Sequence, residues 1–150
     1  MQYQIVENTQ IAPQVFLLDL AGDTSMVKAP GQFVQLRLPG FFLRRPISIC
    51  DWDEGGMTLI YKVVGQGTEA LSRLQPGDTL DALCGLGNGY DLSGVGNNPL
   101  VVGGGVGIPP LYALSKELIK RGAAPTVILG FNKAEEIFLL DEFEDLGVET

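Results

Sequence analysis

A run of glycines after a short apolar stretch is the first feature that could bind a ligand. Leu100–Val102 is apolar, Gly103–Gly107 holds four glycines, and Pro109 and Pro110 open a segment with apolar residues at helical spacing. Glycines let a backbone approach a pyrophosphate, and the free N–H groups at a helix start favour a phosphate there. The pattern predicts a strand, a nucleotide-binding turn and a helix; a tight turn without a ligand is the alternative.

Two arginines before a proline form a second constellation, at Leu43–Ile49. The planar guanidinium of Arg45 suits a pyrophosphate, and Ser48 offers a hydroxyl to a ring nitrogen or carbonyl. On its own, this stretch favours a solvated arginine pair beside an edge strand.

A third constellation, Tyr61–Thr68, shifts that balance. It runs from a strand into a helix for which Thr68 is the predicted N-cap, so Gly67 and Thr68 would turn backbone N–H groups toward an anion. Arg45, Lys62 and this helix start, within one small barrel, could together hold a dinucleotide, with Tyr61 stacking on a ring.

Two absences restrict the chemistry. The chain has no histidine, which excludes a Ser-His-Asp triad, a Cys-His pair and a histidine metal site within it. Chemistry would therefore have to come from a cofactor, and we predict no catalytic side chain and no metal ligand. Cys50 and Cys84 lie far apart in apolar runs and are predicted to be buried free thiols.

Composition sets wider bounds. With 150 residues, 45% of them hydrophobic, the chain can bury the core of one domain, or of one domain and part of another. The net charge of −8, with scattered Lys and Arg, argues against nucleic acid. There is no apolar run of membrane-spanning length and no basic signal-peptide start, so we expect a cytoplasmic chain.

The first part of the chain has the pattern of β-strands. Strands are predicted around Tyr3 and Ile5 and at Val15–Leu20, Phe33–Leu38, Pro46–Asp51, Met57–Val64 and Thr79–Cys84, with one helix at Thr68–Leu74. Six short strands at this spacing predict a small antiparallel barrel over residues 1–97.

Residues 98–150 change to alternating strand and helix. A strand, a helix of about a dozen residues closed by Gly122, and a strand at Thr126–Phe131 form a βαβ unit. Ala134–Leu146 is predicted to be a second, acidic helix, and Val148–Thr150 to begin another strand. A doubly wound sheet has about five or six strands, so this is the first half of a Rossmann-like domain. We expect either a fragment or completion by a partner.

Several motifs together resemble the ferredoxin–NADP reductase superfamily, in which a barrel binds FAD and a Rossmann-like domain binds the pyridine nucleotide. They are, in order, Pro30–Phe33, Arg45–Ser48, Gly65–Thr68, Pro76–Asp78 and Gly105–Pro110, the last matching a Gly-x-Gly-x-x-Pro turn. Within it, the chain is most similar to the family of electron-transfer subunits of type B dihydroorotate dehydrogenases, at Arg44–Ile49, Leu86–Tyr90, Gly103–Pro110 and Phe138–Phe143.

The resemblance implies that NADH reduces FAD here, that a [2Fe-2S] cluster carries the electrons on, and that an FMN-containing catalytic subunit exchanges them with dihydroorotate and orotate in pyrimidine biosynthesis. Hydride transfer to a flavin needs positioning but no protein acid or base, consistent with the lack of histidine. By matching positions, the FAD-binding residues would be Arg45, Pro46, Ile47, Ser48, Ile60, Tyr61, Lys62, Gly67 and Thr68. Those facing the pyridine nucleotide would be Gly104, Gly105, Val106 and Gly107.

The chain departs from the family in three places. The cluster cysteines of the family lie beyond the position of Thr150, and two cysteines cannot supply four thiolates. No cluster is therefore expected here, and the isolated chain should be inactive in the full reaction. Cys84-Gly85 replaces an expected Gly-Pro. Phe131–Lys133 lacks the acidic residue that would bind a ribose hydroxyl, so only the resemblance implies NADH rather than NADPH.

Two other functions stay open. One is the small subunit of a related NADPH–ferredoxin or sulfide oxidoreductase, which the Arg-Pro-Ile-Ser form of Arg45–Ser48 disfavours. The other is a non-catalytic interaction domain whose glycines serve only as turns.

Overall fold

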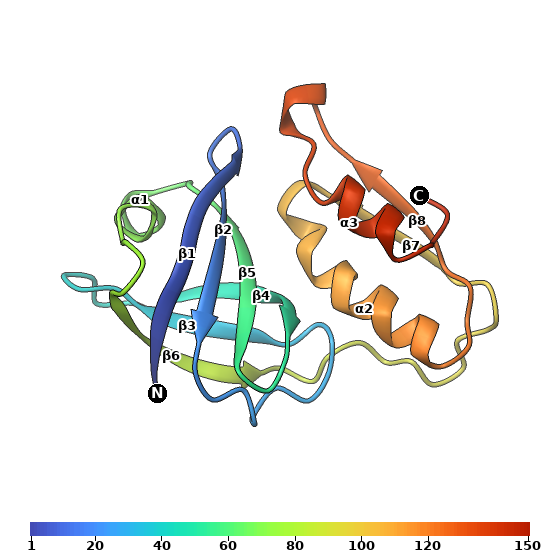
Figure 1. The fold of residues 1–150 in the computed structure, drawn as a ribbon, viewed down its shortest axis with the longest axis horizontal. Helices are drawn as coiled ribbons and strands as arrows, with labels where there is room; N and C mark the ends of the chain where they lie inside the picture. The colour runs from blue at the N-terminus through green and yellow to red at the C-terminus, as the bar shows by residue number, and fades with distance from the viewer.

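Six antiparallel strands close into a barrel, as the strand spacing predicts (Figure 1). The computed structural model describes residues 1–150. The strands are β1 (Gln2–Ala12), β2 (Val15–Ala21), β3 (Phe33–Arg37), β4 (Arg45–Trp52), β5 (Gly56–Lys62) and β6 (Thr79–Leu86), in the spatial order β1-β2-β5-β4-β3-β6. Pairing of β1 with β6 closes the ring, so the barrel has no free edge.

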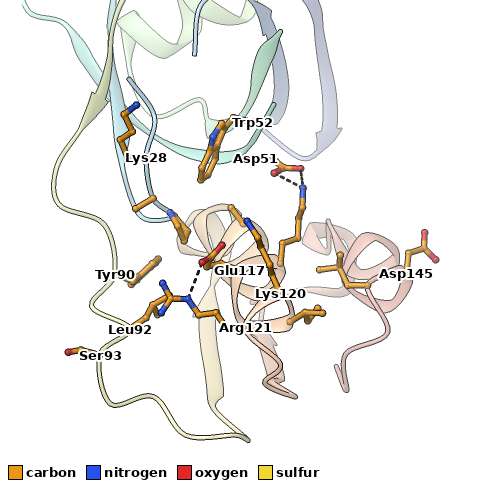
Figure 2. A pocket seen from close by; sticks show the side chains of 16 residues that line it. Lys28, Asp51, Trp52, Tyr90, Leu92, Ser93, Glu117, Lys120, Arg121 and Asp145 are labelled. Carbon is orange, nitrogen blue, oxygen red and sulfur yellow. Dashed lines mark hydrogen bonds and ion pairs between the residues drawn. The ribbon is translucent and has the colours of Figure 1, made fainter. Parts of the chain in front are cut away.

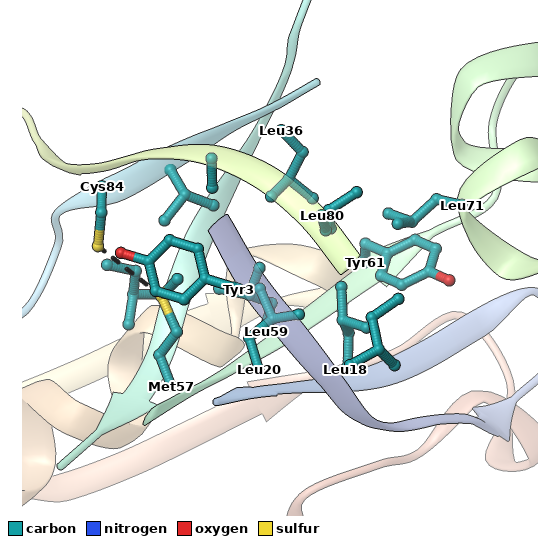
Figure 3. Packing of buried hydrophobic residues seen from close by; sticks show 14 of the residues in the cluster. Tyr3, Leu18, Leu20, Leu36, Met57, Leu59, Tyr61, Leu71, Leu80 and Cys84 are labelled. Carbon is teal, nitrogen blue, oxygen red and sulfur yellow. Dashed lines mark hydrogen bonds between the residues drawn. The ribbon is translucent and has the colours of Figure 1, made fainter. Parts of the chain in front are cut away.

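The barrel interior is filled by the inward-facing residues of every strand. In β3, Val34 and Leu36 are buried and Arg37 is exposed, so the alternation in the sequence corresponds to the two faces of the strand. Leucines from several strands lie between the rings of Tyr3 and Tyr61 (Figure 3). Both hydroxyls are satisfied, since Tyr3 donates to the carbonyl of Asp23 at 2.6 Å and Tyr61 to a side-chain oxygen of β1.

The second unit is built on two parallel strands, β7 (Leu100–Gly104) and β8 (Thr126–Gly130). Between them come a 3₁₀ turn, η1 (Gly105–Gly107), and the helix α2 (Pro109–Lys120), which confirms the predicted strand, turn and helix. Gly122 follows α2 with φ of +85°, the left-handed conformation expected at a helix end.

Helix α2 joins the two units, because it packs against β4 on one side and β7 on the other. A second core of 13 buried residues includes Ile108, Leu111 and Leu118 from this region together with Cys50 and Ile60 of the barrel. The second core therefore contains residues from both sides of position 97.

The predicted helix over residues 134–146 is wrong in extent. It is replaced by a 3₁₀ turn, η2 (Ala134–Glu136), and a short helix, α3 (Leu140–Asp145). The break occurs because Phe138 and Leu139 are buried and Leu139 takes a φ of +62°. Glu149 then pairs in parallel with Thr126, as expected for a strand beginning there. None of the helices has the length and apolarity to cross a lipid bilayer.

The barrel core makes a stability prediction. Leu18 is fully buried, whereas Val6 of the neighbouring strand is 58% exposed. Leu18→Ala should lower the free energy of unfolding by about 2–5 kcal/mol, because it removes packed atoms and leaves a cavity. Val6→Ala should change it by less than about 0.5 kcal/mol. Urea denaturation of both variants measures this, and equal losses would contradict the assignment of the interior.

Candidate nucleotide-binding site

The rim of the barrel at the start of β4 brings Arg45 and Gly67 together. The helix α1 (Gln66–Ser72) passes so close that a Cβ on Gly67 would collide with the guanidinium of Arg45. That guanidinium lies over the ring of Phe41, 5.2 Å from its centroid, and donates to the carbonyl of Leu43 at 2.5 Å. It forms no ion pair with a carboxylate, so its charge remains available.

The adjacent Arg44 is used differently. Its Nη1 donates to Oδ1 of Asp81 at 3.1 Å and to the carbonyl of Gln35 at 3.2 Å. The hydrogen bond from Arg44 holds the pKa of Asp81 below its usual value. Arg44 therefore ties β4 to its neighbours, and of the two arginines only Arg45 presents an uncompensated charge.

The turn between β5 and α1 corrects the role predicted for Thr68. The helix begins at Gln66, after Gly65, so Thr68 is not the N-cap. Its buried hydroxyl accepts hydrogen bonds from the N–H groups of Val64 at 2.9 Å and Gly65 at 3.2 Å, and donates to the carbonyl of Gly65. The backbone N–H groups of Gly67 and Thr68 belong to the first helical turn, which has no intrahelical acceptor for them.

Two of the predicted FAD residues have side chains that face away from any surface. Ile60 is buried in the second core, and Tyr61 is 1% exposed and stacks on Phe16 at 5.7 Å between centroids. The prediction that the Tyr61 ring stacks on a ligand is wrong, because the barrel core encloses it. Only the backbone of these residues is left for a ligand. Pro46, in contrast, is exposed at the rim, and Ile47 and Ser48 are partly exposed.

The first glycine of the turn allows α2 to pack closely on β7. A Cβ on Gly103 would collide with Leu111, so this glycine lets the helix lie close to the strand. Gly105 has φ of +51°, in the left-handed region that favours glycine. Gly104 and Val106 are exposed at the carboxyl end of the strand, where nucleotides bind in α/β sheets.

A groove of about 560 Å³ joins this turn to the barrel. Its walls include Lys62 from the end of β5, Gly104, Gly105 and Val106 from the turn, and Glu136 from η2. The structure therefore brings Lys62, which was predicted to bind FAD, together with three residues that were predicted to face the pyridine nucleotide, Gly104, Gly105 and Val106. Arg45, Gly67 and Thr68 lie outside this groove, at the rim of the barrel.

Glu136 is a residue that the sequence analysis missed. The dehydrogenase pattern places an acidic residue directly after the second strand, at Phe131–Lys133, and this chain has none there. The turn η2 instead brings the carboxylate of Glu136 to the groove a few residues later. The run Ala134-Glu135-Glu136 is the available signal in the sequence, but its pattern predicts the start of a long helix.

The two thiols do not fit an iron–sulfur cluster. Cys84 belongs to the barrel core and Cys50 to the second core, and both are buried and free. A [2Fe-2S] cluster needs four ligands on one site, so these residues do not hold one. Burial raises the pKa of the Cys50 thiol, with a further contribution from the charge of Asp51.

Solved structures define the class of protein. No family model matches the chain. Its fold is similar to an NADH-dependent reduced ferredoxin–NADP oxidoreductase, with a TM-score of 0.85, 35% identity, and coverage of 97% of this chain and 54% of that one. It also matches phthalate dioxygenase reductase, with a TM-score of 0.83, 18% identity, and coverage of 95% and 47%. The barrel followed by a strand–turn–helix unit is thus the fold of ferredoxin–NADP reductase-like structures.

Sequence comparison narrows this class. The chain is 40% identical over 95% of its length to the electron transfer subunit of dihydroorotate dehydrogenase B (NAD⁺) of Fusobacterium nucleatum, covering 58% of that protein. The subunit of Enterococcus faecalis is 43% identical over 95% of the chain, with 57% of that protein covered. The chain is thus a homologue of the dihydroorotate dehydrogenase B electron transfer subunits, as the motifs indicate, and spans somewhat under two thirds of their length.

The buried thiols make a chemical prediction. Burial raises the pKa of the Cys50 thiol and keeps it protonated, and it also keeps reagents away from both thiols. In the native protein, neither Cys50 nor Cys84 should react with dithionitrobenzoate at pH 8 within minutes, because both are buried. In denaturant both should react at once. Fast stoichiometric labelling of the native protein would contradict the placement of these residues.

Proposed function

We propose that this chain is the FAD- and NADH-binding part of a cytoplasmic electron transfer subunit. In this proposal residues 1–97 hold FAD, residues 98–150 begin the pyridine-nucleotide domain, and the electrons pass to the FMN-containing catalytic subunit of a dihydroorotate dehydrogenase. FAD supplies the redox chemistry, since it accepts a hydride and releases electrons singly. The protein's own contribution is to bind and position the two nucleotides.

The position of Arg45 is the observation that carries the proposal. Its unpaired guanidinium lies against the backbone of Gly67, beside the N–H groups that the first turn of α1 leaves without partners. A planar donor fork next to free N–H groups suits the oxygens of a pyrophosphate. Ser48, three residues further along β4, is partly exposed and can donate to a ring atom.

The groove at the glycine turn supports NADH as the electron donor. Gly104 is exposed and Gly105 partly exposed, and without side chains both allow a pyrophosphate to approach closely. The carboxylate of Glu136 in the same groove can accept hydrogen bonds from ribose hydroxyls. It would repel the 2′-phosphate of NADPH, so it favours NADH.

A second candidate is a subunit of an NADH-dependent ferredoxin–NADP oxidoreductase, which the 35% identity to such a structure favours. The two functions differ in the acceptor. Joined to the C-terminal segment of a relative, which would supply the cluster, and mixed with a dihydroorotate dehydrogenase catalytic subunit, the chain should give NADH-dependent exchange with orotate under the first proposal. Reduction of ferredoxin without that subunit would support the second.

The two arginines make a paired prediction about FAD. Arg45→Ala should weaken FAD binding about 10–150-fold, since a lost hydrogen bond to a charged group costs about 1.5–3 kcal/mol. Arg44→Ala is the matched control, and should lower the melting temperature with little effect on FAD, because it removes the guanidinium that ties β4 to Asp81. Titration of the apoprotein with FAD, followed by flavin absorbance, measures the affinities. Equal losses in the two variants, or no FAD retained by the wild type, would overturn the assignment.

Glu136 makes a prediction about nucleotide preference. Glu136→Gln removes the negative charge but keeps an oxygen that accepts hydrogen bonds, so NADPH should gain affinity relative to NADH by about tenfold. Glu135→Gln is the control, because the neighbouring carboxylate does not line the groove. Calorimetric titration with both nucleotides gives the ratio. An unchanged ratio in Glu136→Gln would show that this carboxylate does not face the ribose.

A further inference from the structure

A second groove, of about 900 Å³, lies between the barrel and the C-terminal half of α2 (Figure 2). None of the residues assigned to FAD or the pyridine nucleotide lines it. It is also remote from the glycine turn: that turn precedes Pro109, and Lys120 stands about 16 Å further along the helix axis. The groove is therefore separate from the site described above.

Two aromatic rings form part of its walls. Trp52 ends β4 and packs partly on the barrel core. Tyr90 is 40% exposed, yet its ring lies on Gly31, where a Cβ would stand only 2.9 Å from it, and its N–H donates to the carbonyl of Pro30 at 3.0 Å. Neither ring stacks on another aromatic ring of the chain, so both can contact a ligand.

Cationic side chains outnumber carboxylates at this groove, whereas the chain as a whole is acidic. The net charge is −8, yet four of the ten Lys and Arg residues line this groove: Lys28, Lys116, Lys120 and Arg121. Two of these cations are neutralised, since Lys116 pairs with Asp51 at 2.7 Å and Arg121 with Glu117 at 3.0 Å.

The other two cations, Lys28 and Lys120, have no ion-pair partner, and Asp145 is the one carboxylate of the groove that is also unpaired. In Figure 2 the side chain of Lys120 extends from α2 toward the barrel and Trp52. An ammonium group and an indole ring at one groove are the two contacts that a flat ring bearing an acidic group requires.

We propose that this groove binds a nucleoside monophosphate or a ligand of the same chemistry, with its planar ring against Trp52 and its phosphate at Lys120. The volume of about 900 Å³ lies within the usual range of small-molecule sites. The ammonium group of Lys120, which has no carboxylate partner, suits a phosphate better than a neutral ligand. Because the groove lies at the junction of the barrel and α2, a bound ligand would contact both units.

Trp52 provides the test, because it is the only tryptophan of the chain. Titration of the purified protein with AMP, followed by Trp52 emission and by calorimetry, should give one saturable transition with the same dissociation constant by both methods. Ribose 5-phosphate lacks the ring and adenosine lacks the charge, so each should bind at least tenfold more weakly than AMP.

Two variants locate the site. Lys120→Ala should weaken AMP binding at least tenfold, whereas Lys133→Ala, which removes an exposed lysine near the carboxyl end of β8, should leave it unchanged. If calorimetry detects AMP binding that neither alters Trp52 emission nor weakens in Lys120→Ala, AMP binds elsewhere and the proposal is wrong. It is equally wrong if millimolar AMP gives no signal. Because AMP is also a part of FAD and of NADH, every titration contains FAD and NAD⁺ in excess, which fill their own sites and leave this groove for AMP.

Discussion

The packing of α2 between β4 and β7 is the contact on which the geometry of the molecule depends. Apolar side chains of α2 and of the segment before it share one core with Cys50 and Ile60 on the outer face of the barrel. Burial of this area contributes more than the ion pair of Lys116 with Asp51 at its edge, because an exposed pair is worth at most about 1 kcal/mol. The core thus sets the distance between Lys62 and the glycine turn, and so the width of the groove between them.

The same core explains which parts of the fold the sequence could predict. Strands with one buried face, such as β3, alternate clearly and were placed correctly. β5 is buried on both faces, with Leu59 and Tyr61 in the barrel and Ile60 in the second core. Its apolar run therefore predicts a strand but not which side chains remain accessible. That is why Tyr61 was wrongly expected to contact a ligand ring.

Residue types and short motifs in the sequence identify candidate site residues better than they predict the role of each residue. The motif around Arg45 identified the rim of the barrel, but Arg44 and Arg45 cannot be told apart by residue type. The difference arises from the neighbours of each, Asp81 for Arg44 and Gly67 for Arg45, which are distant in sequence. Thr68 was placed in the correct turn, yet its hydroxyl stabilises the turn itself because Gly65 precedes the helix.

The largest error, at residues 134–146, falls at the candidate site. Periodicity and acidic residues favour one helix, but Phe138 is drawn onto Phe131 at the end of β8, with the two rings 5.3 Å apart and edge to face. This contact and the left-handed backbone of Leu139 end the first turn early. Phe131, Glu136 and Phe138 consequently all line the groove beside the glycine turn. The packing that interrupts the helix is thus also what holds a carboxylate at the edge of the candidate nucleotide site, and no local pattern in the sequence encodes it.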